Sequence, residues 1–234
     1  MKVGDAIRKF RKVKVLLVGD SGTGKTYSVV RAAVESGKKT LFIDTEFGAI
    51  EEFASMGYEG DEVEYVPASN YEDVVDAVKR IGEFEMVVLD SLDDVVRMKI
   101  VHLENKFIEL GYYVIGDRKV VIKNPECFVL PWNFYPSVYS DVVRIVYNII
   151  DSKVDVVVTT KEFGESESKK NLLEVVKAKF DSVIKLDREV VGDGNTVFYG
   201  VVEKNRGKNI AGKKVKMPET LINKIRRVSN EKEN

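Results

Sequence analysis

The stretch VKVLLVGDSGTGKT, residues 13–26, decides the fold of this chain. Its first six residues form an apolar run that predicts a β-strand buried on both faces of a sheet. The next eight, Gly19 to Thr26, match the pattern G-x-x-x-x-G-K-[ST] in full. Such glycines let successive backbone N–H groups turn inward and hold phosphate oxygens at the start of a helix. With a helix expected at residues 25–36, the motif has the context it requires, and we predict that a nucleoside triphosphate binds here.

The side chains of this loop have expected roles. The ammonium of Lys25 would reach the β- and γ-phosphates, and the hydroxyl of Thr26 would ligate Mg²⁺. Because the N-K-x-D pattern of guanine-binding proteins does not occur in the sequence, we expect ATP rather than GTP, together with Mg²⁺. The residues expected to hold the nucleotide are Asp20, Ser21, Gly22, Thr23, Gly24, Lys25, Thr26 and Tyr27.

Two carboxylates follow other apolar strands. The run MVVLD at residues 86–90 ends in Asp90, which would hold Mg²⁺ through its water shell. Glu46 ends the run LFIDTE at residues 41–46, and an acid at a strand end beside the phosphates suits a general base that orients the attacking water. Asp44 is the second candidate for this base. A role for Glu46 as an ordinary helix-capping acid stays open.

Length and composition bound the class of protein. The chain has 234 residues, 44% hydrophobic and 32% charged, which favours one domain, residues 1–228, with a frayed tail at 229–234. No apolar run approaches the roughly 18 residues of a spanning helix, and the basic N-terminus lacks the apolar stretch of a signal peptide. One cysteine and one histidine are too few for a disulfide scaffold or a zinc site. We therefore expect a cytoplasmic protein with no membrane partner.

Charge and amide content add two expectations. The chain contains no glutamine but many lysines and glutamates, a composition typical of thermophile proteins. The net charge of −1 provides no overall attraction to nucleic acid, so any such contact must come from a local patch.

Apolar runs alternate with helical patterns, which predicts an α/β fold with a mostly parallel sheet flanked by helices. Towards the C-terminus, strands at residues 183–186 and 196–203 around Gly192-Asp193-Gly194 predict an antiparallel portion, and Pro218 opens a last helix. The other expected strands are 13–18, 40–44, 63–66, 86–89 and 154–159, and the other expected helices are 71–81, 138–149 and 172–180.

Residues 93–131 interrupt the alternation. They predict a helix followed by a hairpin that turns at Gly116-Asp117, and we interpret them as an insertion into the core rather than a second domain. Just after them, Trp132, Phe134 and Tyr135 would form a base-stacking platform or, as is more common for such residues, part of the core.

The stretch KNRGKNIAGKKVK, residues 204–216, carries six basic residues and no acidic one. Three interpretations stay open: a finger that acts on a neighbouring subunit, a nucleic-acid patch, or a solvated edge strand protected by lysines.

Together these motifs resemble the RecA/KaiC-like P-loop ATPases, and most closely the compact phage-type proteins with little beyond a RecA core, including single-strand annealing ATPases. The likeness covers roughly residues 12–92 and 131–221. Glu46 in FIDTE looks like the catalytic glutamate of that family, and LDS at 89–91 resembles its Walker B end. Lys204 and Arg206 are similar to the K-x-R finger of the KaiC-like branch, which reaches into a neighbour's nucleotide site.

The resemblance implies an ATPase that assembles head-to-tail as a homo-oligomer, with Lys25, Glu46, Lys204 and Arg206 as catalytic residues. It also implies that the strand ending in Thr159-Thr160-Lys161 lies between those of the phosphate loop and Asp90, where a polar residue would sense hydrolysis or simply be solvated. DNA recombination or repair, with single-stranded DNA as partner, is an expected setting. However, the segment EFGESESKK at 162–170 contains three glutamates where RecA-like recombinases place a cationic DNA-binding loop.

Two alternatives stay open. One is a protein that binds ATP to regulate its interactions and hydrolyses it poorly. The other is a P-loop kinase, for which Arg188 and the basic stretch are the candidates for a lid.

Overall fold

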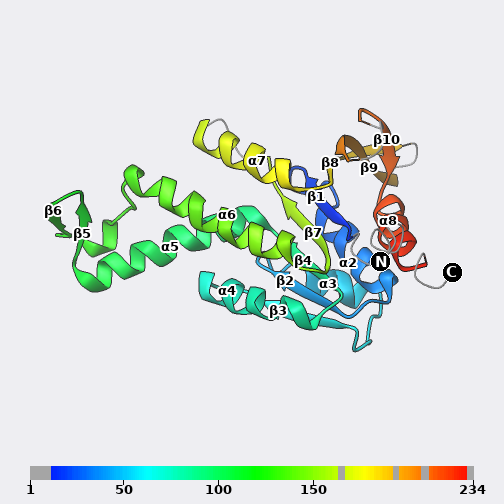
Figure 1. Ribbon diagram of the computed structural model, residues 1–234, viewed down its shortest axis with the longest axis horizontal. Coiled ribbons are helices and arrows are strands. Elements are labelled where there is room, and N and C mark those ends of the chain that lie inside the picture. The colour runs from blue at the N-terminus through cyan, green and yellow to red at the C-terminus, as the bar shows by residue number, and fades with distance from the viewer. Residues whose placement is uncertain (1–11, 163–166, 192–194, 207–210, 231–234) are drawn as a thin grey trace, which may run out of the picture.

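The computed structural model describes residues 12–162, 167–191, 195–206 and 211–230. An eight-stranded sheet lies at its centre, in the order β10-β9-β8-β1-β7-β4-β2-β3 (Figure 1). From β8 to β3 neighbouring strands are parallel, whereas β8, β9 and β10 pair antiparallel, which confirms the predicted fold class. The strands are β1 (Lys14–Val18), β2 (Thr40–Asp44), β3 (Val63–Pro67), β4 (Met86–Asp90), β7 (Asp155–Thr160), β8 (Ser182–Val191), β9 (Asn195–Asn205) and β10 (Lys214–Lys216).

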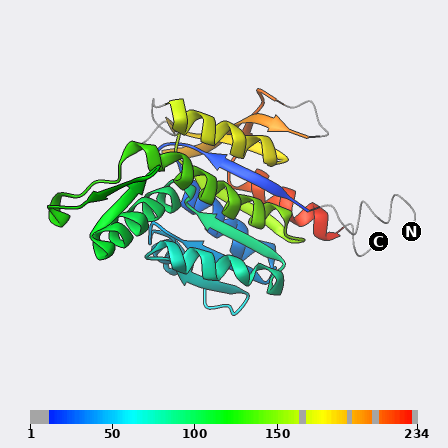
Figure 2. The ribbon, with the colours of Figure 1, turned by 60° about the vertical axis from the view of Figure 1, so that its left-hand side comes forward.

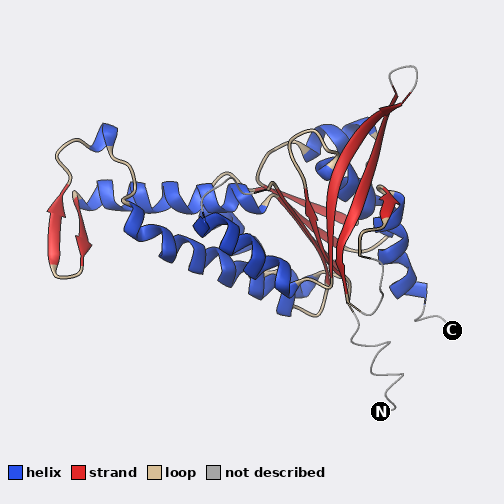
Figure 3. Ribbon diagram, turned by 90° about the horizontal axis from the view of Figure 1, so that it is seen from above, coloured by secondary structure: helices blue, strands red, loops and turns tan. Residues whose placement is uncertain are grey.

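Helices cover both faces of the sheet (Figures 2 and 3). Because successive strand residues point to opposite faces, Val15 and Leu17 of β1 enter one core and Leu16 and Val18 enter the other. This two-sided burial explains the continuous apolar runs of the central strands. One face carries α2 (Lys25–Ser36), α3 (Ala49–Ser55) and α8 (Glu219–Asn230), and the other carries α4 (Tyr71–Lys79), α5 (Leu92–Leu110), α6 (Tyr135–Asp151) and α7 (Glu167–Lys179).

Most predicted elements form within one or two residues of their expected bounds, with a few differences. The helix α7 begins earlier than predicted, and β8 and β9 are longer. The short helix α3 was not predicted, since a helix of seven residues holds too few apolar positions to establish a period. The strand β10 lies in the basic stretch, for which an edge strand was one of the three interpretations. The predicted turn at residues 192–194 lies outside the described residues.

The helices α5 and α6 extend past the sheet and carry a separate hairpin of β5 (Tyr112–Ile115) and β6 (Arg118–Val121), as Figures 1 and 3 show. We call residues 99–144, which include this hairpin, the arm. The hairpin turns at the predicted residues, where Gly116 adopts a φ of 56°. Three short 3₁₀-helices complete the fold: η1 (Ile81–Glu83), η2 (Pro125–Cys127) and η3 (Trp132–Phe134).

The aromatic residues that precede α6 have different environments. The ring of Phe134 lies 4.9 Å from that of Phe107, inside the aromatic cluster of the arm. Trp132 is 84% exposed, so the expectation that it belongs to the core is wrong. It begins η3 directly after Pro131, and its side chain is directed to solvent. Among the described residues, no helix is both long and apolar enough to cross a membrane.

A buried acid joins the amino-terminal ends of β1 and β7. Asp155 is 1% exposed, and its Oδ1 accepts a hydrogen bond of 2.8 Å from the backbone N–H of Val13. Its Oδ2 forms an ion pair with Lys38, which follows α2. A charge buried in this way is stabilised only by its partners.

We expect Asp155→Ala to lower the free energy of unfolding by about 3–5 kcal/mol, because it leaves the Val13 N–H without its acceptor and the Lys38 ammonium without its counter-ion. Urea denaturation would measure the loss. The matched control is Asp76→Ala, which removes an exposed pair with Lys79 and should change stability by less than about 1 kcal/mol. If the two substitutions lowered the free energy of unfolding equally, the stabilising role of the buried Asp155 would be contradicted.

Candidate nucleotide-binding site

The carboxyl ends of the central parallel strands meet at one edge of the sheet. In the register of β2 with β4, Asp44 lies opposite Asp90, and β7 lies between β1 and β4, as predicted. The segments that follow these strands therefore converge. They are the phosphate loop at residues 19–24 after β1, Glu46 after β2, Ser91 after β4 and Lys161 after β7.

The phosphate loop has a backbone that favours glycine at two positions. Gly22 and Gly24 have φ angles of 76° and 82°, in the left-handed region that other residues rarely adopt. A Cβ atom built on Gly24 would also lie 2.7 Å from the ring of Phe198. The helix α2 begins directly after this glycine, so the loop and the helix N-terminus form the expected cradle for phosphate oxygens.

Lys25 lies inside this cradle. It is 5% exposed, and its Nζ donates hydrogen bonds of 2.8 and 2.9 Å to the backbone carbonyls of Gly19 and Asp20. Burial lowers the pKa of the ammonium, against the attraction of Glu46 and Asp90. The two carbonyls are neutral, so phosphate oxygens would be stronger acceptors for the same group.

Asp90 and Thr26 offer a site that fits Mg²⁺. Asp90 is 1% exposed, and its Oδ1 accepts a hydrogen bond from the hydroxyl of Thr159. Within the described part of the chain, its Oδ2 has no hydrogen-bond partner. Burial raises the pKa of Asp90 to about 6, while Thr159 and Thr26 act in the opposite direction. A buried carboxylate oxygen without a partner, beside a threonine hydroxyl, is a suitable place for a hard divalent cation.

Glu46 lies at the same edge with a side chain that is 27% exposed. Its Oε1 accepts hydrogen bonds of 3.1 Å from the Ser91 hydroxyl and 2.7 Å from the Lys161 ammonium. Burial acts to raise the pKa of Glu46, but the hydrogen bonds from Lys161, Asp94 and Ser91 lower it overall. The group is therefore a carboxylate at neutral pH, placed at the edge that holds the phosphate loop.

Asp44 has a different role from Glu46. It is fully buried, and it accepts hydrogen bonds of 2.9–3.0 Å from the backbone N–H groups of Glu46, Phe47 and Ala49. The hydroxyl of Tyr65 donates a fourth, at 3.0 Å. With both its oxygens engaged in this way, Asp44 fixes the backbone that carries Glu46, and it is not available as a base.

Three charged residues at the site were not among the predicted site residues. Lys161, considered only as a solvated or sensing strand end, contacts Glu46 directly. Asp93 and Asp94 occupy the first turn of α5, where acids are common because they favour the helix dipole. That common pattern hides their position beside Glu46, with which they form a cluster of carboxylates. Burial and the neighbouring Glu46 raise the pKa of Asp94 to about 6.

The hairpin of β8 and β9 continues past the end of β1 and lies beside the phosphate loop. The ring of Phe198 is 5.6 Å from that of Tyr27, a predicted nucleotide-binding residue. Arg188 places Nη1 3.4 Å from the carbonyl oxygen of Gly22. An aromatic pair and a guanidinium thus border the loop, although these partners lie far apart in sequence.

Lys204 and Arg206 do not lie at the edge of the sheet that holds the phosphate loop. Lys204 donates 2.9 Å hydrogen bonds to the carbonyls of Lys177 and Ala178, at the carboxyl end of α7. Arg206 donates a 2.7 Å hydrogen bond to the carbonyl of Ala178 as well, so the two side chains lie on the same side of β9. The strand β8 begins at Ser182, just after α7 ends, so these cations lie near the opposite edge of the sheet from their own phosphate loop.

The later lysines of the basic stretch belong to an edge strand. Lys214 of β10 pairs with Glu189 at 2.9 Å, and Lys216 pairs with Glu219 at 3.1 Å. Lysines on an edge strand discourage pairing with other chains. These contacts favour the edge-strand interpretation for residues 214–216.

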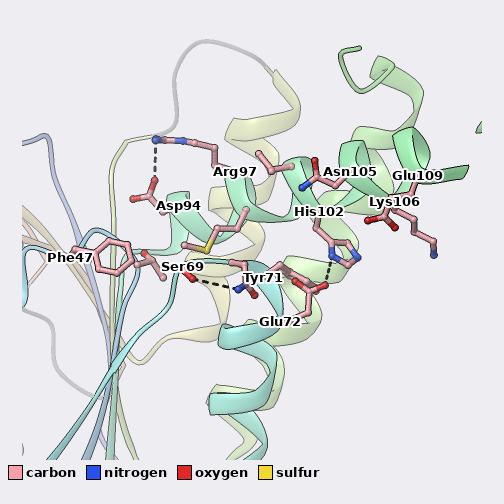
Figure 4. Close-up of a pocket in the computed structure, with 14 residues that line it drawn as sticks. Phe47, Ser69, Tyr71, Glu72, Asp94, Arg97, His102, Asn105, Lys106 and Glu109 are labelled. Carbon is pink, nitrogen blue, oxygen red and sulfur yellow. Dashed lines mark hydrogen bonds and ion pairs between the residues drawn. The ribbon is translucent and has the colours of Figure 1, made fainter. Parts of the chain in front are cut away.

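A cleft of about 750 Å³ adjoins the site between α4 and α5 (Figure 4). It extends from Thr45 and Asp94 along α5 to Glu109. Arg97 reaches back to Asp94 at 3.2 Å, and His102 pairs with Glu72, as the dashed lines in Figure 4 show. The charged side chains that line the cleft are mixed in sign, with Glu72, Asp94 and Glu109 beside Arg97 and Lys106, so the cleft presents no cationic surface of the kind that binds a phosphate backbone.

Comparisons with known proteins agree with this geometry. The sequence profile of a family described as AAA domain matches residues 11–109, less than half of the chain. A KaiC-like protein from the hyperthermophilic archaeon Pyrococcus horikoshii has a similar structure, with a TM-score of 0.50 and 18% identity over 86% of this chain and 83% of that one. The RadB recombinase has a TM-score of 0.54 and 15% identity over 88% and 86% of the two chains. No curated protein matches the sequence.

The fold is that of the RecA/KaiC-like P-loop ATPases. This likeness confirms the predicted fold.

We expect Gly24→Ala to abolish Mg²⁺-ATP binding, because the added Cβ meets Phe198 and the left-handed backbone must move out of the cradle. The matched control is Gly37→Ala at the other end of α2. Gly37 has a φ of 64°, and a Cβ there would have no atom of the described chain within 4 Å. Both variants should lose about 1–2 kcal/mol of stability, and only Gly24→Ala should lose binding in a calorimetric titration. Normal ATP affinity in Gly24→Ala would contradict the cradle.

Proposed function

We propose that this chain binds ATP with Mg²⁺ and hydrolyses it. The observation that carries the proposal is the convergence of three groups at one sheet edge: a glycine-rich loop around Lys25, an unpartnered buried oxygen of Asp90, and the carboxylate of Glu46. The likeness to RecA/KaiC-like proteins supports the reaction class.

Each group has one task in this proposal. Lys25 exchanges the carbonyls of Gly19 and Asp20 for oxygens of the β- and γ-phosphates and neutralises their charge. Thr26 and Asp90 would hold Mg²⁺, which when bound neutralises charge that develops on the phosphates. Glu46 orients the attacking water and accepts its proton as a general base.

The contact between Lys161 and Glu46 favours a second candidate, an ATP-regulated interaction protein with little turnover. A carboxylate that accepts a hydrogen bond from an ammonium is a weaker base than a free one. Tight ATP binding without measurable phosphate release would support this candidate over the first. Single-stranded DNA, expected from the family resemblance, stays outside our proposal, because Lys214 and Lys216 are paired within the chain and the lining of the cleft mixes carboxylates with cations.

We expect Glu46→Gln to keep Mg²⁺-ATP binding and to slow turnover by about 10²–10⁴-fold, because the amide preserves the shape but accepts no proton. Phosphate release under saturating ATP would measure turnover. Glu51→Gln, at an exposed position of α3 nearby, is the matched control and should retain the wild-type rate. Lys25→Ala should instead lose binding. An unchanged rate in Glu46→Gln would move the base to another residue.

We further propose that the protein acts as a head-to-tail homo-oligomer in which Lys204 and Arg206 serve a neighbouring subunit. Their distance from their own phosphate loop supports this, because cations at the opposite edge of the sheet could contact a nucleotide only in another copy. To reach a neighbour's nucleotide, both side chains must leave the carbonyls at the end of α7.

Mixing two inactive variants tests this arrangement. Arg206→Ala should slow ATP hydrolysis about 10³–10⁵-fold if Arg206 stabilises a neighbour's γ-phosphate. Combined with Glu46→Gln protein, it should regain part of the activity, since some interfaces then join an intact glutamate to an intact arginine. Wild-type activity in Arg206→Ala, or an active monomer in sedimentation experiments, would overturn the proposal.

A further inference from the structure

The arm carries most of the large apolar side chains that the chain exposes. Of the twelve exposed ones among the described residues, seven lie between residues 101 and 132. They include Val121 at 63% exposed, Val129 at 70% and Trp132 at 84%. Apolar side chains gathered in this way on a protein surface mark a site that binds a partner or a membrane.

One face of the hairpin packs on the arm near its base. The ring of Tyr113 on β5 lies 6.0 Å from that of Phe107 on α5 and 5.7 Å from that of Phe128. Ile115 lies two residues further along β5 and points to the same face, because side chains of a strand alternate. It adjoins the turn and is exposed. This face is therefore covered at its base and open at its tip.

The other face of the hairpin is turned away from the arm. In the register, Tyr112 lies opposite Val121, and Val114 lies opposite Lys119, so these four side chains share that face. Val114 and Val121 are both exposed. The ammonium of Lys119 lies 3.7 Å from the centroid of the Tyr112 ring. Both faces of the hairpin thus expose aliphatic side chains.

The hairpin also carries more cations than acids. Residues 112–123 contain Arg118, Lys119 and Lys123 but only one acid, Asp117, and the neighbouring acids in sequence belong to α5 and η2. In the part of the chain that the structure describes, neither Arg118 nor Lys123 forms an ion pair. Cations without partners, placed beside apolar side chains, are attracted to an anionic surface.

These features fit a lipid surface better than nucleic acid or protein. Single-stranded nucleic acid stacks its bases on aromatic rings, whereas the exposed side chains here are mainly aliphatic and Lys119 covers the ring of Tyr112. A protein partner covers one face, but this thin hairpin exposes apolar side chains on both faces and stands clear of the sheet (Figure 3). A lipid interface surrounds an inserted tip, and it favours tryptophan, lysine and arginine.

We propose that the arm binds the surface of an anionic membrane through its hairpin. Val114, Ile115 and Val121 enter the headgroup region, and Arg118 and Lys123 contact lipid phosphates. The contact stays shallow, because the open edges of a two-stranded hairpin need water for their backbone groups. The expectation of no membrane partner rested on the lack of a spanning helix and of a signal peptide, and a contact with the surface requires neither.

The first test uses Trp132, the single tryptophan of the chain, as a reporter from the arm. Vesicles of phosphatidylcholine and phosphatidylglycerol in equal parts should shift its emission to shorter wavelengths, because the indole leaves water. The protein should also float with these vesicles in a density gradient. Vesicles of phosphatidylcholine alone should bind at least about tenfold more weakly, and added salt should weaken binding to the anionic vesicles.

The second test locates the contact by substitution. Val121→Asp should abolish flotation with the anionic vesicles, because it places a carboxylate on the outward face of the hairpin. The matched control is Val175→Asp, which makes the same change at an exposed position of α7 and should bind as the wild type does. Arg118→Gln/Lys123→Gln should reduce the preference for anionic vesicles. Circular dichroism would check the fold of each variant.

The same emission identifies the other occupants. No change with anionic vesicles would overturn the proposal. A shift that depends on protein concentration without vesicles would assign the arm to a second copy of the chain, and a change caused by single-stranded DNA but not by vesicles would assign it to nucleic acid. Equal losses in Val121→Asp and Val175→Asp would place the contact outside the arm. Should Val121→Asp not fold, the variant without the two cations decides the question.

Discussion

A strand buried on both faces admits polar side chains only where it ends. In β1, β2 and β4 every residue is buried, and the sheet covers its apolar side chains with helices on each side. The polar residues of these strands and of β7 lie at or near their ends, where water, backbone N–H groups or a ligand can satisfy them. Because the central strands are parallel, their carboxyl ends meet at one edge. The chemistry of the molecule is concentrated there as a consequence of its core.

The charged groups at this edge are held in place before any ligand binds. Lys25 donates to backbone carbonyls, Lys161 to carboxylates, and Asp44 fixes the backbone before and after Glu46. Asp90 differs, because one of its oxygens has no partner among the described residues. In the proposed function, a nucleotide with its metal would exchange existing contacts for stronger ones and would satisfy the remaining oxygen. Such an arrangement limits the conformational entropy lost on binding.

The sequence predicted the fold and the contiguous part of the site, and it failed where partners are distant. The phosphate loop is a local pattern, so residues 19–26 and the strand and helix around it were placed correctly. Lys161 and Glu46 are 115 residues apart, and Arg188 and Gly22 are 166 apart. The order of the strands predicts that such residues share an edge, but not which side chains touch. The exposure of Trp132 could not be predicted either, because its direction depends on how η3 leaves Pro131.

The arm is an extension of α5 and α6, two helices that also pack on the main core. The helix α5 begins beside Ser91, where Asp93 holds Lys161, and it ends at the hairpin after 19 residues, a length of about 28 Å at 1.5 Å per residue. Along this length it packs on α6, to which Lys99 is joined by an ion pair with Asp141 at 2.9 Å. Phe107 and Phe134 continue the main core into the arm. The hairpin and the first turn of α5 are therefore joined by one continuous helix that packs on α6, rather than by a loop. Asp93, which contacts Lys161, lies on that same helix.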